Sequence, residues 1–356
     1  KKVMDTNTLT LNFLTLISLI SFIVTLLISK YSHFILFGRL QDKDFLKPQA
    51  FHSESTPRAG GLAIFLVFIV FILSYYFLKN IFLIDYITIC LFLFFLGFLD
   101  DLKIKINPNV RLASMLIILF FFINFFSIEI TKSGLDFLNL WLENYFFQTS
   151  FVLLCFLFII NGANLIDGFN GLLAINLIII NSILVYINIV SENNEFSVFI
   201  VAQIIILLSF LLFNFPNAKI FLGDGGSYLM GSLVALNTIV SNNLNPNHSS
   251  FFYCSLLFYL FFEVFFSFIR KIFQKKSPIH PDGKHLHMLN YQKLTKISGK
   301  NKSHYLNSII INLVYFILIL PSLYFSSDPM MSRYWFFTLL VIYLLIYLRL
   351  YRLTKN

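Results

Sequence analysis

Residues 225–262 read GGSYLMGSLVALNTIVSNNLNPNHSSFFYCSLLFYLFF and contain no Asp, Glu, Lys or Arg. A membrane-spanning helix needs about 20 apolar residues, so this stretch is too long for a single span. Its middle, Asn242–Asn247, is rich in Asn and contains a Pro, and it predicts a turn between two helices. The pattern predicts a chain that crosses a lipid bilayer more than once.

The composition of the whole chain is that of a membrane protein. Hydrophobic residues make up 58% of its 356 residues, and charged residues only 12%. That charged fraction is about half the value typical of a soluble domain. These values exclude a soluble enzyme, a disordered chain and a disulfide-stabilised secreted domain. Because the apolar runs lack the alternation of a lipid-facing strand, they predict an all-α polytopic protein.

We expect eleven transmembrane helices within one integral-membrane domain, residues 1–356. The first is expected to be a retained helix and not a signal peptide. The predicted spans are Leu11–Ser29, Gly60–Leu78, Ile81–Leu99, Leu112–Ser127, Ser150–Ile166, Leu172–Val190, Val198–Phe215, Ser227–Val240, Phe251–Phe273, Leu306–Phe325 and Tyr334–Leu350.

The Lys and Arg residues are unevenly divided between the two ends of these spans. One side holds 21 of the 26, in residues 30–59, 100–111, 161–171, 216–226, 270–305 and 349–356. Because cytoplasmic loops carry an excess of Lys and Arg, this side is predicted to be cytoplasmic, with the N-terminus outside and the C-terminus inside. The net charge of +9 is therefore assigned to membrane orientation, and no nucleic-acid partner is expected.

Five polar clusters lie on the predicted cytoplasmic side, and the first two are short. Residues 55–61, STPRAGG, place Arg58 where it can clamp a phosphate, although a single Arg also serves as an orientation signal. Asp100 and Asp101 are adjacent carboxylates at a membrane boundary. Oxygen ligands of this kind suit Mg²⁺ or Mn²⁺, and the alternative is a solvated helix end.

The third and fourth clusters combine acids with glycine. Residues 161–171, NGANLIDGFNG, contain no Lys or Arg, and a helix reaching Asp167 would put Asn164 and Asp167 on one face. They can hold a metal, a phosphate or a nucleotide, or form a plain turn. In residues 221–227, FLGDGGS, glycines at a helix start predict an anion-binding turn, and Asp224 can cap the helix or bind Mg²⁺.

The fifth cluster, residues 277–287 or SPIHPDGKHLH, has three His within eight residues. No Cys lies near, so phosphate binding by His and Lys is preferred over a zinc site, and a surface loop is the alternative. Glu263 lies inside a predicted span. A carboxylate there is a functional hypothesis by default, unless it bonds a neighbouring helix.

Four acids, Asp100, Asp101, Asp167 and Asp224, are thus predicted at span ends on one side among basic residues. This set suits a divalent cation that handles phosphates at the level of the lipid headgroups. One substrate is then a lipid phosphate and the other a soluble nucleotide. A transporter or flippase of an anionic lipid-linked substrate is the alternative, although its polar site would lie near the bilayer midplane. A structural subunit does not explain four acids on one side.

Taken together, TPRAGGLAIF, GFLDD, NGANLIDGFNG, FLGDGGS and SPIHPDGKHLH resemble the bacterial polyprenyl-phosphate N-acetylhexosamine-1-phosphate transferases of glycosyl transferase family 4. The resemblance runs from Thr56 to Met288, and its first motif looks like the branch that primes O-antigen, common antigen or teichoic acid synthesis. It implies that undecaprenyl phosphate attacks the sugar-bearing phosphorus of a UDP-N-acetylhexosamine and that UMP leaves. It also implies Mg²⁺ or Mn²⁺, a site on the cytoplasmic face of the inner membrane, and a homodimer.

The resemblance also implies roles for individual residues. Asp224 would be the chief metal ligand, helped by Asp167, and Asp100 would activate the lipid phosphate as a base or as a nucleophile. Asp101 and Asp167 would complete the catalytic group. Nucleotide or phosphate binding is expected from Arg58, Asn161, Asn164, Asn170, Ser227, Lys284, His285 and His287.

Three positions depart from the family pattern. Met288 stands where the last His of the motif is usual, Glu263 where relatives usually carry Asp, and His280 where Ser is common. The identity of the sugar is therefore left open.

Overall fold

The computed structural model describes residues 6–42, 55–81, 83–104, 106–277 and 282–355. It is 79% helical, as predicted, and its only described strands, β1 (Gln41–Asp42) and β2 (Thr56–Pro57), pair antiparallel. The helices are η1 (Ile35–Gly38), α1 (Thr6–Tyr31), α2 (Gly60–Lys79), α3 (Ile84–Asp101), α4 (Pro108–Phe125), α5 (Asp136–Leu142), α6 (Tyr145–Ile166), α7 (Leu172–Val190), α8 (Asn194–Asn214), α9 (Gly223–Leu244), α10 (Ser250–Leu256), α11 (Phe258–Phe273), α12 (Leu286–Ser298), α13 (Lys300–Tyr324) and α14 (Pro329–Lys355).

Eight helices in the described part of the chain are long and apolar enough to cross a membrane, and α10 with α11 makes a ninth span if the bent pair is counted as one. The eight are α1, α2, α4, α6, α7, α8, α13 and α14. The protein is therefore an integral membrane protein, as predicted. The expected count of eleven is higher because it includes α3 and α9.

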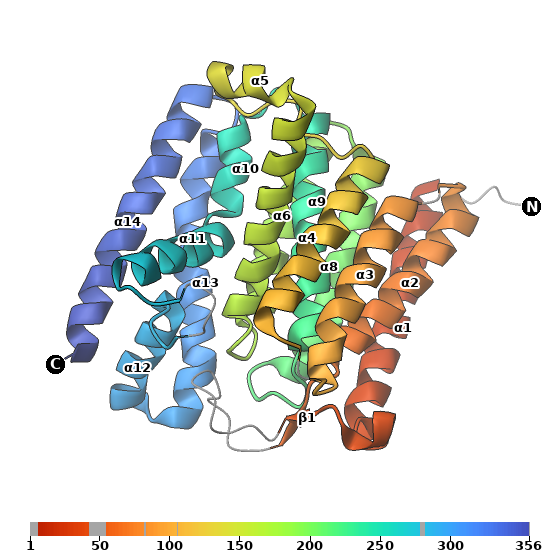
Figure 1. The fold of residues 1–356 in the computed structure, drawn as a ribbon. Helices are drawn as coiled ribbons and strands as arrows, with labels where there is room; N and C mark the ends of the chain where they lie inside the picture. The colour runs from red at the N-terminus through yellow and green to blue at the C-terminus, as the bar shows by residue number, and fades with distance from the viewer. Residues whose placement is uncertain (1–5, 43–54, 82, 105, 278–281, 356) are drawn as a thin grey trace, which may run out of the picture.

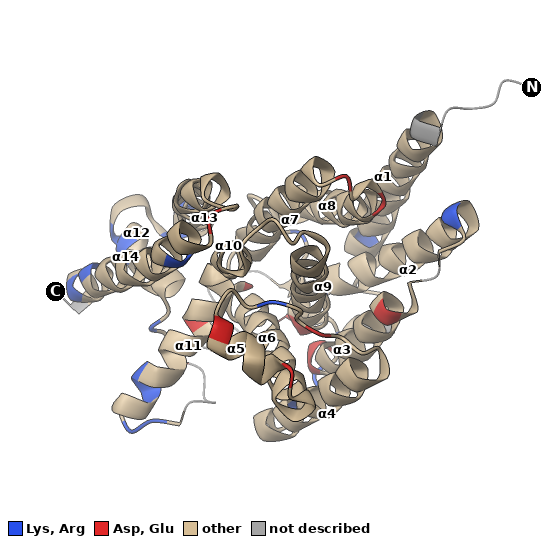
Figure 2. Cartoon of the chain, turned by 90° about the horizontal axis from the view of Figure 1, so that it is seen from above, with Lys and Arg blue, Asp and Glu red and all other residues tan. Residues whose placement is uncertain are grey.

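Helices α3 and α9 are not among these eight, for different reasons. Helix α3 carries Asp85, Asp100 and Asp101 at its ends, and α9 is rich in Gly, Ser and Asn. Figure 2 shows α9 in the interior of the bundle, and 18 of its 22 residues are buried. A helix enclosed by other helices does not face lipid, so its side chains can be polar where they find partners.

Asn237 illustrates such a partner network inside the bundle. Its Nδ2 donates to Oε1 of Gln203 on α8 at 2.8 Å, and its Oδ1 accepts from the hydroxyl of Tyr86 on α3 at 3.1 Å. These hydrogen bonds join three helices at buried positions. Because a polar group without a partner is costly there, the network helps to fix how α9 packs.

The region after α9 differs in part from the prediction. The turn at Asn242–Asn247 is confirmed, because α9 ends at Leu244 and α10 begins at Ser250. The predicted span Phe251–Phe273 is broken, with α10 and α11 meeting at 74°, and Figure 1 shows α11 lying across its neighbours. Residues 286–298, which were expected to belong to a loop, form α12.

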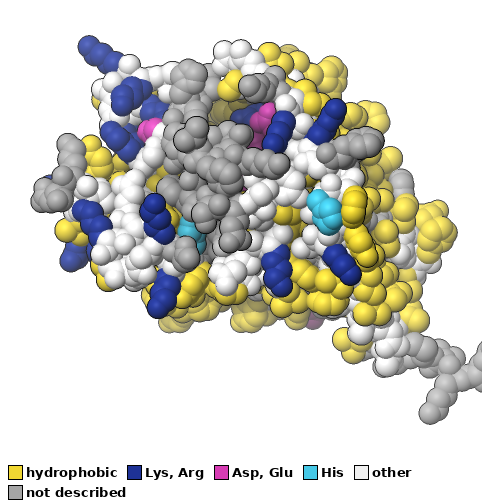
Figure 3. Space-filling model, turned by 90° about the horizontal axis from the view of Figure 1, so that it is seen from below, with side chains coloured by type: hydrophobic (Ala, Val, Ile, Leu, Met, Phe, Trp, Pro, Cys, Tyr) yellow, Lys and Arg dark blue, Asp and Glu magenta, His cyan; other side chains and the backbone are white. Residues whose placement is uncertain are grey.

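The segments that carry the five polar clusters lie at one end of the bundle, at the bottom of Figure 1. They include the β1–β2 ribbon, the end of α3 and the starts of α9 and α12. Figure 3 views this end directly, and Lys and Arg side chains are spread across it. The alternating course of the helices thus gathers sequence motifs that are far apart along the chain.

Candidate active site

Asp101 joins the end of α3 to the start of α9. Its Oδ1 accepts the backbone N–H of Asp224, and its Oδ2 accepts that of Gly225, both at 2.9 Å. The first amides of a helix lack partners within the helix, so a buried carboxylate there stabilises its N-terminus. Sequence analysis predicted an anion-binding turn at this helix start, and in the structure the anion on these two amides is Asp101 itself.

Glycines allow the backbones to approach closely at this junction. A Cβ on Gly97 would lie 2.4 Å from the carbonyl oxygen of Asp224, and one on Gly61 would lie 2.3 Å from the backbone nitrogen of Gly226. Gly223 has a φ of +80°, which disfavours other residues, and its position faces the Asp101 carboxylate. Helices α2, α3 and α9 are therefore held together at backbone distance.

Arg111, near the start of α4, bridges Asp100, a predicted catalytic acid, and Asp224, the predicted chief metal ligand. Its Nη1 contacts Oδ2 of Asp100 and lies 3.1 Å from Oδ2 of Asp224. Both carboxylates keep some exposure, 24% for Asp100 and 21% for Asp224. These two acids are therefore reachable from outside the bundle, in contrast to Asp101, which is 3% exposed.

Arg58, which follows β2, lies on the other side of the same acids. Its Nε donates to Oδ2 of Asp42 at 2.8 Å, and its Nη1 lies 3.7 Å from Asp224 and 3.9 Å from Asp101. Burial acts to lower the pKa of Arg58, but the carboxylates of Asp224, Asp42 and Asp101 raise it above its usual value. The guanidinium is thus a permanent positive charge beside the acids, where a phosphate can bind.

The third cluster reaches the same place from the end of α6. Asn164 donates from Nδ2 to the hydroxyl of Ser227 at 3.0 Å, and that hydroxyl donates to the carbonyl of Asp224 at 3.1 Å. The helix that was expected to reach Asp167 ends at Ile166, so Asp167 lies directly after α6. Burial and the charge of Asp224 raise the pKa of Asp167 well above its usual value.

Two other asparagines of this cluster make their described contacts elsewhere. Nδ2 of Asn161 donates to the carbonyl of Leu157 at 2.7 Å, within α6. Nδ2 of Asn170 donates to the carbonyl of Pro216 at 2.9 Å, so it ties the α6–α7 loop to the segment before α9. These contacts support the local fold, and their predicted role in nucleotide binding stays a prediction.

The histidine cluster is built on a second junction, between α11 and α12. Glu263 faces Nδ1 of His285 at 3.2 Å and accepts the backbone N–H of Leu286 at 3.1 Å. His285 and His287 are 2% and 0% exposed. The ring of Phe169 packs edge-on against the ring of His287, with centroids 5.8 Å apart, and so connects this junction to the third cluster.

Burial affects the groups around these histidines differently. It lowers the pKa of His287 to about 4. Burial acts to raise the pKa of Asp282, but the hydrogen bond from Arg270 lowers that pKa below its usual value.

The structure also places other residues of the fifth cluster. Lys284 lies with Nζ 5.8 Å from the ring centre of Tyr351 on α14. His280 lies outside the described residues, and Met288 is a buried core residue of α12.

The acids at this end of the bundle suit a cation that is completed by substrate, and not a preformed metal site. No three His, Cys, Asp or Glu side chains of the described residues form a ready-made metal site. Mg²⁺, however, is commonly bound by one or two carboxylates together with water and substrate phosphates. Asp224 is partly exposed, and its charge acts on Asp167 strongly enough to raise the pKa of that carboxyl, so these two acids fit a role as cation ligands.

Two residues at this site were absent from the predicted set. Arg111 lies directly before the predicted span Leu112–Ser127, and a lone Arg at that place was a usable signal of a phosphate contact. Asp42 pairs with Arg58 across a gap of 16 residues, and nothing in the sequence marked it. Both were missed because their roles depend on tertiary contacts.

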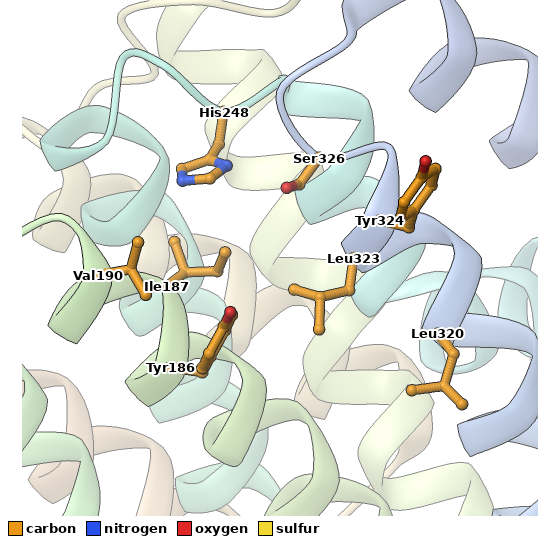
Figure 4. Close-up of a pocket in the computed structure, with 8 residues that line it drawn as sticks. All are labelled: Tyr186, Ile187, Val190, His248, Leu320, Leu323, Tyr324 and Ser326. Atoms are coloured by element: carbon orange, nitrogen blue, oxygen red, sulfur yellow. The ribbon is translucent and has the colours of Figure 1, made fainter.

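A cavity of about 350 Å³ lies at the opposite end of the bundle from the acids. Figure 4 shows it between the end of α7, the end of α13 and the loop that carries His248. Its lining is mostly apolar and includes Tyr186, Leu320 and Leu323. The predicted catalytic residues do not border it.

Fold and site together define a polytopic membrane protein with acids and guanidinium groups gathered at one membrane boundary. The sequence profile of glycosyl transferase family 4 matches residues 82–242, which include the second, third and fourth clusters. The undecaprenyl-phosphate alpha-N-acetylglucosaminyl 1-phosphate transferase of Thermotoga maritima is 28% identical over 69% of this chain and 71% of its own.

Phospho-N-acetylmuramoyl-pentapeptide-transferases match as well. The phospho-N-acetylmuramoyl-pentapeptide-transferase of Streptococcus uberis is 33% identical over 64% of this chain and 73% of its own length. That of Clostridioides difficile is 27% identical over 52% and 62%. The chain belongs to glycosyl transferase family 4, as its motifs predicted. The predicted enzyme class is confirmed, because these relatives are phosphotransferases.

Proposed function

We propose that the protein transfers an N-acetylhexosamine 1-phosphate from a UDP-sugar to undecaprenyl phosphate or a similar polyprenyl phosphate. The observation that carries the proposal is the meeting of Asp100, Asp101 and Asp224 with Arg58 and Arg111 at one end of the bundle. Phosphoryl transfer depends mainly on positioning and on neutralising charge, which such a set supplies. The reaction would be the priming step of a cell-surface polysaccharide, such as O-antigen, common antigen or teichoic acid.

In this reaction an oxygen of the lipid phosphate attacks the phosphorus that carries the sugar. The bond from that phosphorus to the bridging oxygen breaks, and UMP leaves with the bridging oxygen. Asp100 is partly exposed and contacts Arg111, so it can accept a proton from the lipid phosphate as a base. As a nucleophile it would instead attack the sugar-bearing phosphorus and release UMP, and the lipid phosphate would then displace the carboxylate from that phosphorus. Arg111 and Arg58 would hold phosphate oxygens in place of their present carboxylate partners.

Asp224 and Asp167 would hold Mg²⁺ or Mn²⁺, which neutralises phosphate charge when bound. Asp101 would act indirectly, because its oxygens accept two amides of the helix that carries Asp224. Asn161, Asn164, Asn170, Ser227, Lys284, His285 and His287 would bind the nucleotide, sugar or diphosphate.

We further propose that α3 and α9 also cross the membrane, which gives eleven spans. The enclosure of α9 supports this, since an enclosed helix needs no apolar surface. In Figure 1, α1 begins at one end of the bundle and α14 ends at the other, as an odd number of spans requires. The excess of Lys and Arg at the acid end supports a cytoplasmic site in a bacterial inner membrane. A homodimer is proposed from the family resemblance.

The transporter alternative is less well supported. A transporter would place its polar site near the bilayer midplane, and Glu263, the carboxylate predicted inside a span, is 1% exposed, with both oxygens engaged by residues at the start of α12. A coupling carboxylate would need access to water from each side in turn.

The test uses membranes that contain the protein, undecaprenyl phosphate and a panel of UDP-N-acetyl sugars. We expect Mg²⁺-dependent release of UMP with at least one donor, and comparison of UDP-GlcNAc, UDP-GalNAc and 6-deoxy sugars identifies it. If none of the donors yields UMP while the protein is correctly inserted, the proposed function is wrong.

A further inference from the structure

Glu263 on α11 is a buried carboxylate to which the proposed reaction gives no role. Its Oε1 accepts the backbone N–H of Leu286 in the first turn of α12, at 3.1 Å. Its Oε2 faces Nδ1 of His285, the residue before that turn, at 3.2 Å. One side chain therefore fixes both the start of α12 and the imidazole ring beside it.

This contact determines which way the two nitrogens of His285 face. An ionised carboxylate only accepts hydrogen bonds, so Nδ1 of His285 donates to Glu263. The other nitrogen, Nε2, lies 3.5 Å from Oδ1 of Asp282, which is too long for a strong hydrogen bond. Asp282 is 22% exposed, and Arg270 lies 3.1 Å from its Oδ2. Nε2 thus faces an anionic oxygen at the partly exposed edge of the junction, a contact that is favourable when Nε2 also carries a proton and the ring donates from both nitrogens.

We propose that Glu263 is a positioning residue of the transfer reaction, which holds His285 so that Nε2 faces a phosphate oxygen of the sugar donor. In this structure the carboxylate of Asp282 presents an anionic oxygen of the same chemical kind to that nitrogen. The proposal rests on the proposed function. It differs from a purely structural role, in which Glu263 caps α12 and has no effect through His285.

A double-mutant cycle separates the two roles. The amide of Glu263→Gln can still accept from Leu286, but its NH₂ group opposes Nδ1–H of His285 and disturbs the ring. We expect kcat/KM for UMP release to fall about 10- to 100-fold, as for other carboxylates that orient a functional histidine. In a His285→Gln background the same change should alter kcat/KM less than about 2-fold, because the ring that it orients is gone.

Two further variants serve as controls for the effect of Glu263→Gln on activity. Glu195→Gln removes a carboxylate that is 63% exposed at the opposite end of the bundle, and it should leave activity unchanged. Glu263→Asp keeps the charge but shortens the side chain, so it should retain more activity than Glu263→Gln. Thermal unfolding in detergent reports whether each variant is folded. If Glu263→Gln fails to fold, the cycle is run with Glu263→Asp.

Two results would overturn the proposal. One is a Glu263→Gln variant with wild-type kcat/KM. The other is a loss that multiplies fully with that of His285→Gln, which would show that Glu263 acts on the fold alone. If the wild-type protein releases no UMP, the proposed function is wrong, and the proposal for Glu263, which rests on it, is wrong as well.

Discussion

The two junctions of the site share one construction and differ in their exposure. At the α3–α9 junction Asp101 accepts amides from the first turn of α9, and at the α11–α12 junction Glu263 accepts one from the first turn of α12. Beside the first, Asp224 is 21% exposed, whereas beside the second His285 is 2% exposed.

The difference separates residues that can meet a ligand directly from residues that hold others in place. A partly exposed carboxylate can exchange its present partners for a cation or a phosphate. A buried carboxylate whose two oxygens already have hydrogen-bond partners is held in place and acts through the helix start that it anchors. We therefore assign direct contact with the cation or a phosphate to Asp100 and Asp224. Asp101 and Glu263 are assigned the role of holding other residues in place.

The largest expected effect is that of Asp224→Asn. Removing the charge of the proposed chief metal ligand should lower UMP release about 1000-fold, a loss of several kcal/mol of transition-state stabilisation. Asp85→Asn, at the opposite end of α3, is the matched control and should remain active. Equal activity of the two variants would contradict the assignment.

Asp101→Asn should have a smaller effect of a different kind. An amide nitrogen cannot accept, so one of the α9 amides loses its partner, and stability should fall by about 1–3 kcal/mol. We expect activity to fall about 10- to 100-fold while the Mg²⁺ concentration for half-maximal rate stays within about 2-fold. A strong rise in the Mg²⁺ concentration needed for half-maximal rate would indicate that Asp101 is a metal ligand. That result would contradict its assignment as a residue that only positions α9.

Gly97→Ala tests the close contact of α3 with α9 without changing any charge. The new Cβ would lie 2.4 Å from the Asp224 carbonyl oxygen, so α9 must shift. Stability in detergent should drop by about 1–3 kcal/mol. Gly168→Ala, where no atom lies within 4 Å of the added Cβ, should leave the unfolding midpoint unchanged.

The α11–α12 junction should show a modest pH dependence through His287. Burial lowers its pKa from the ordinary 6.5 to about 4, so the unfolded chain takes up a proton that the folded one does not. Stability should fall as the pH drops from about 6.5 toward 4, by about 1 kcal/mol at about pH 5.5. His287→Phe should flatten this part of the unfolding curve relative to the wild type, while a change at exposed His33 should not.

The sequence was sufficient for the all-α membrane class, the turn after α9 and the gathering of the clusters at one end of the bundle. It could not predict the partner of Asp101, because that contact joins residues 123 positions apart. The polar α12 lacks the apolar length that marks a span, and it was predicted to be loop. The bend between α10 and α11 falls inside a continuous apolar run, where hydrophobicity alone gives no sign of a break.

The central claim is that Asp224 holds the divalent cation. Its most direct test is to measure Mn²⁺ binding to the purified protein by electron paramagnetic resonance, with UDP-sugar present. We expect one bound Mn²⁺ ion per chain, which Mg²⁺ displaces. The Asp224→Asn variant should lose this ion, and the Asp101→Asn variant should retain it. Equal binding by the wild type and Asp224→Asn would contradict it, because the cation would then lie away from the acids at the start of α9.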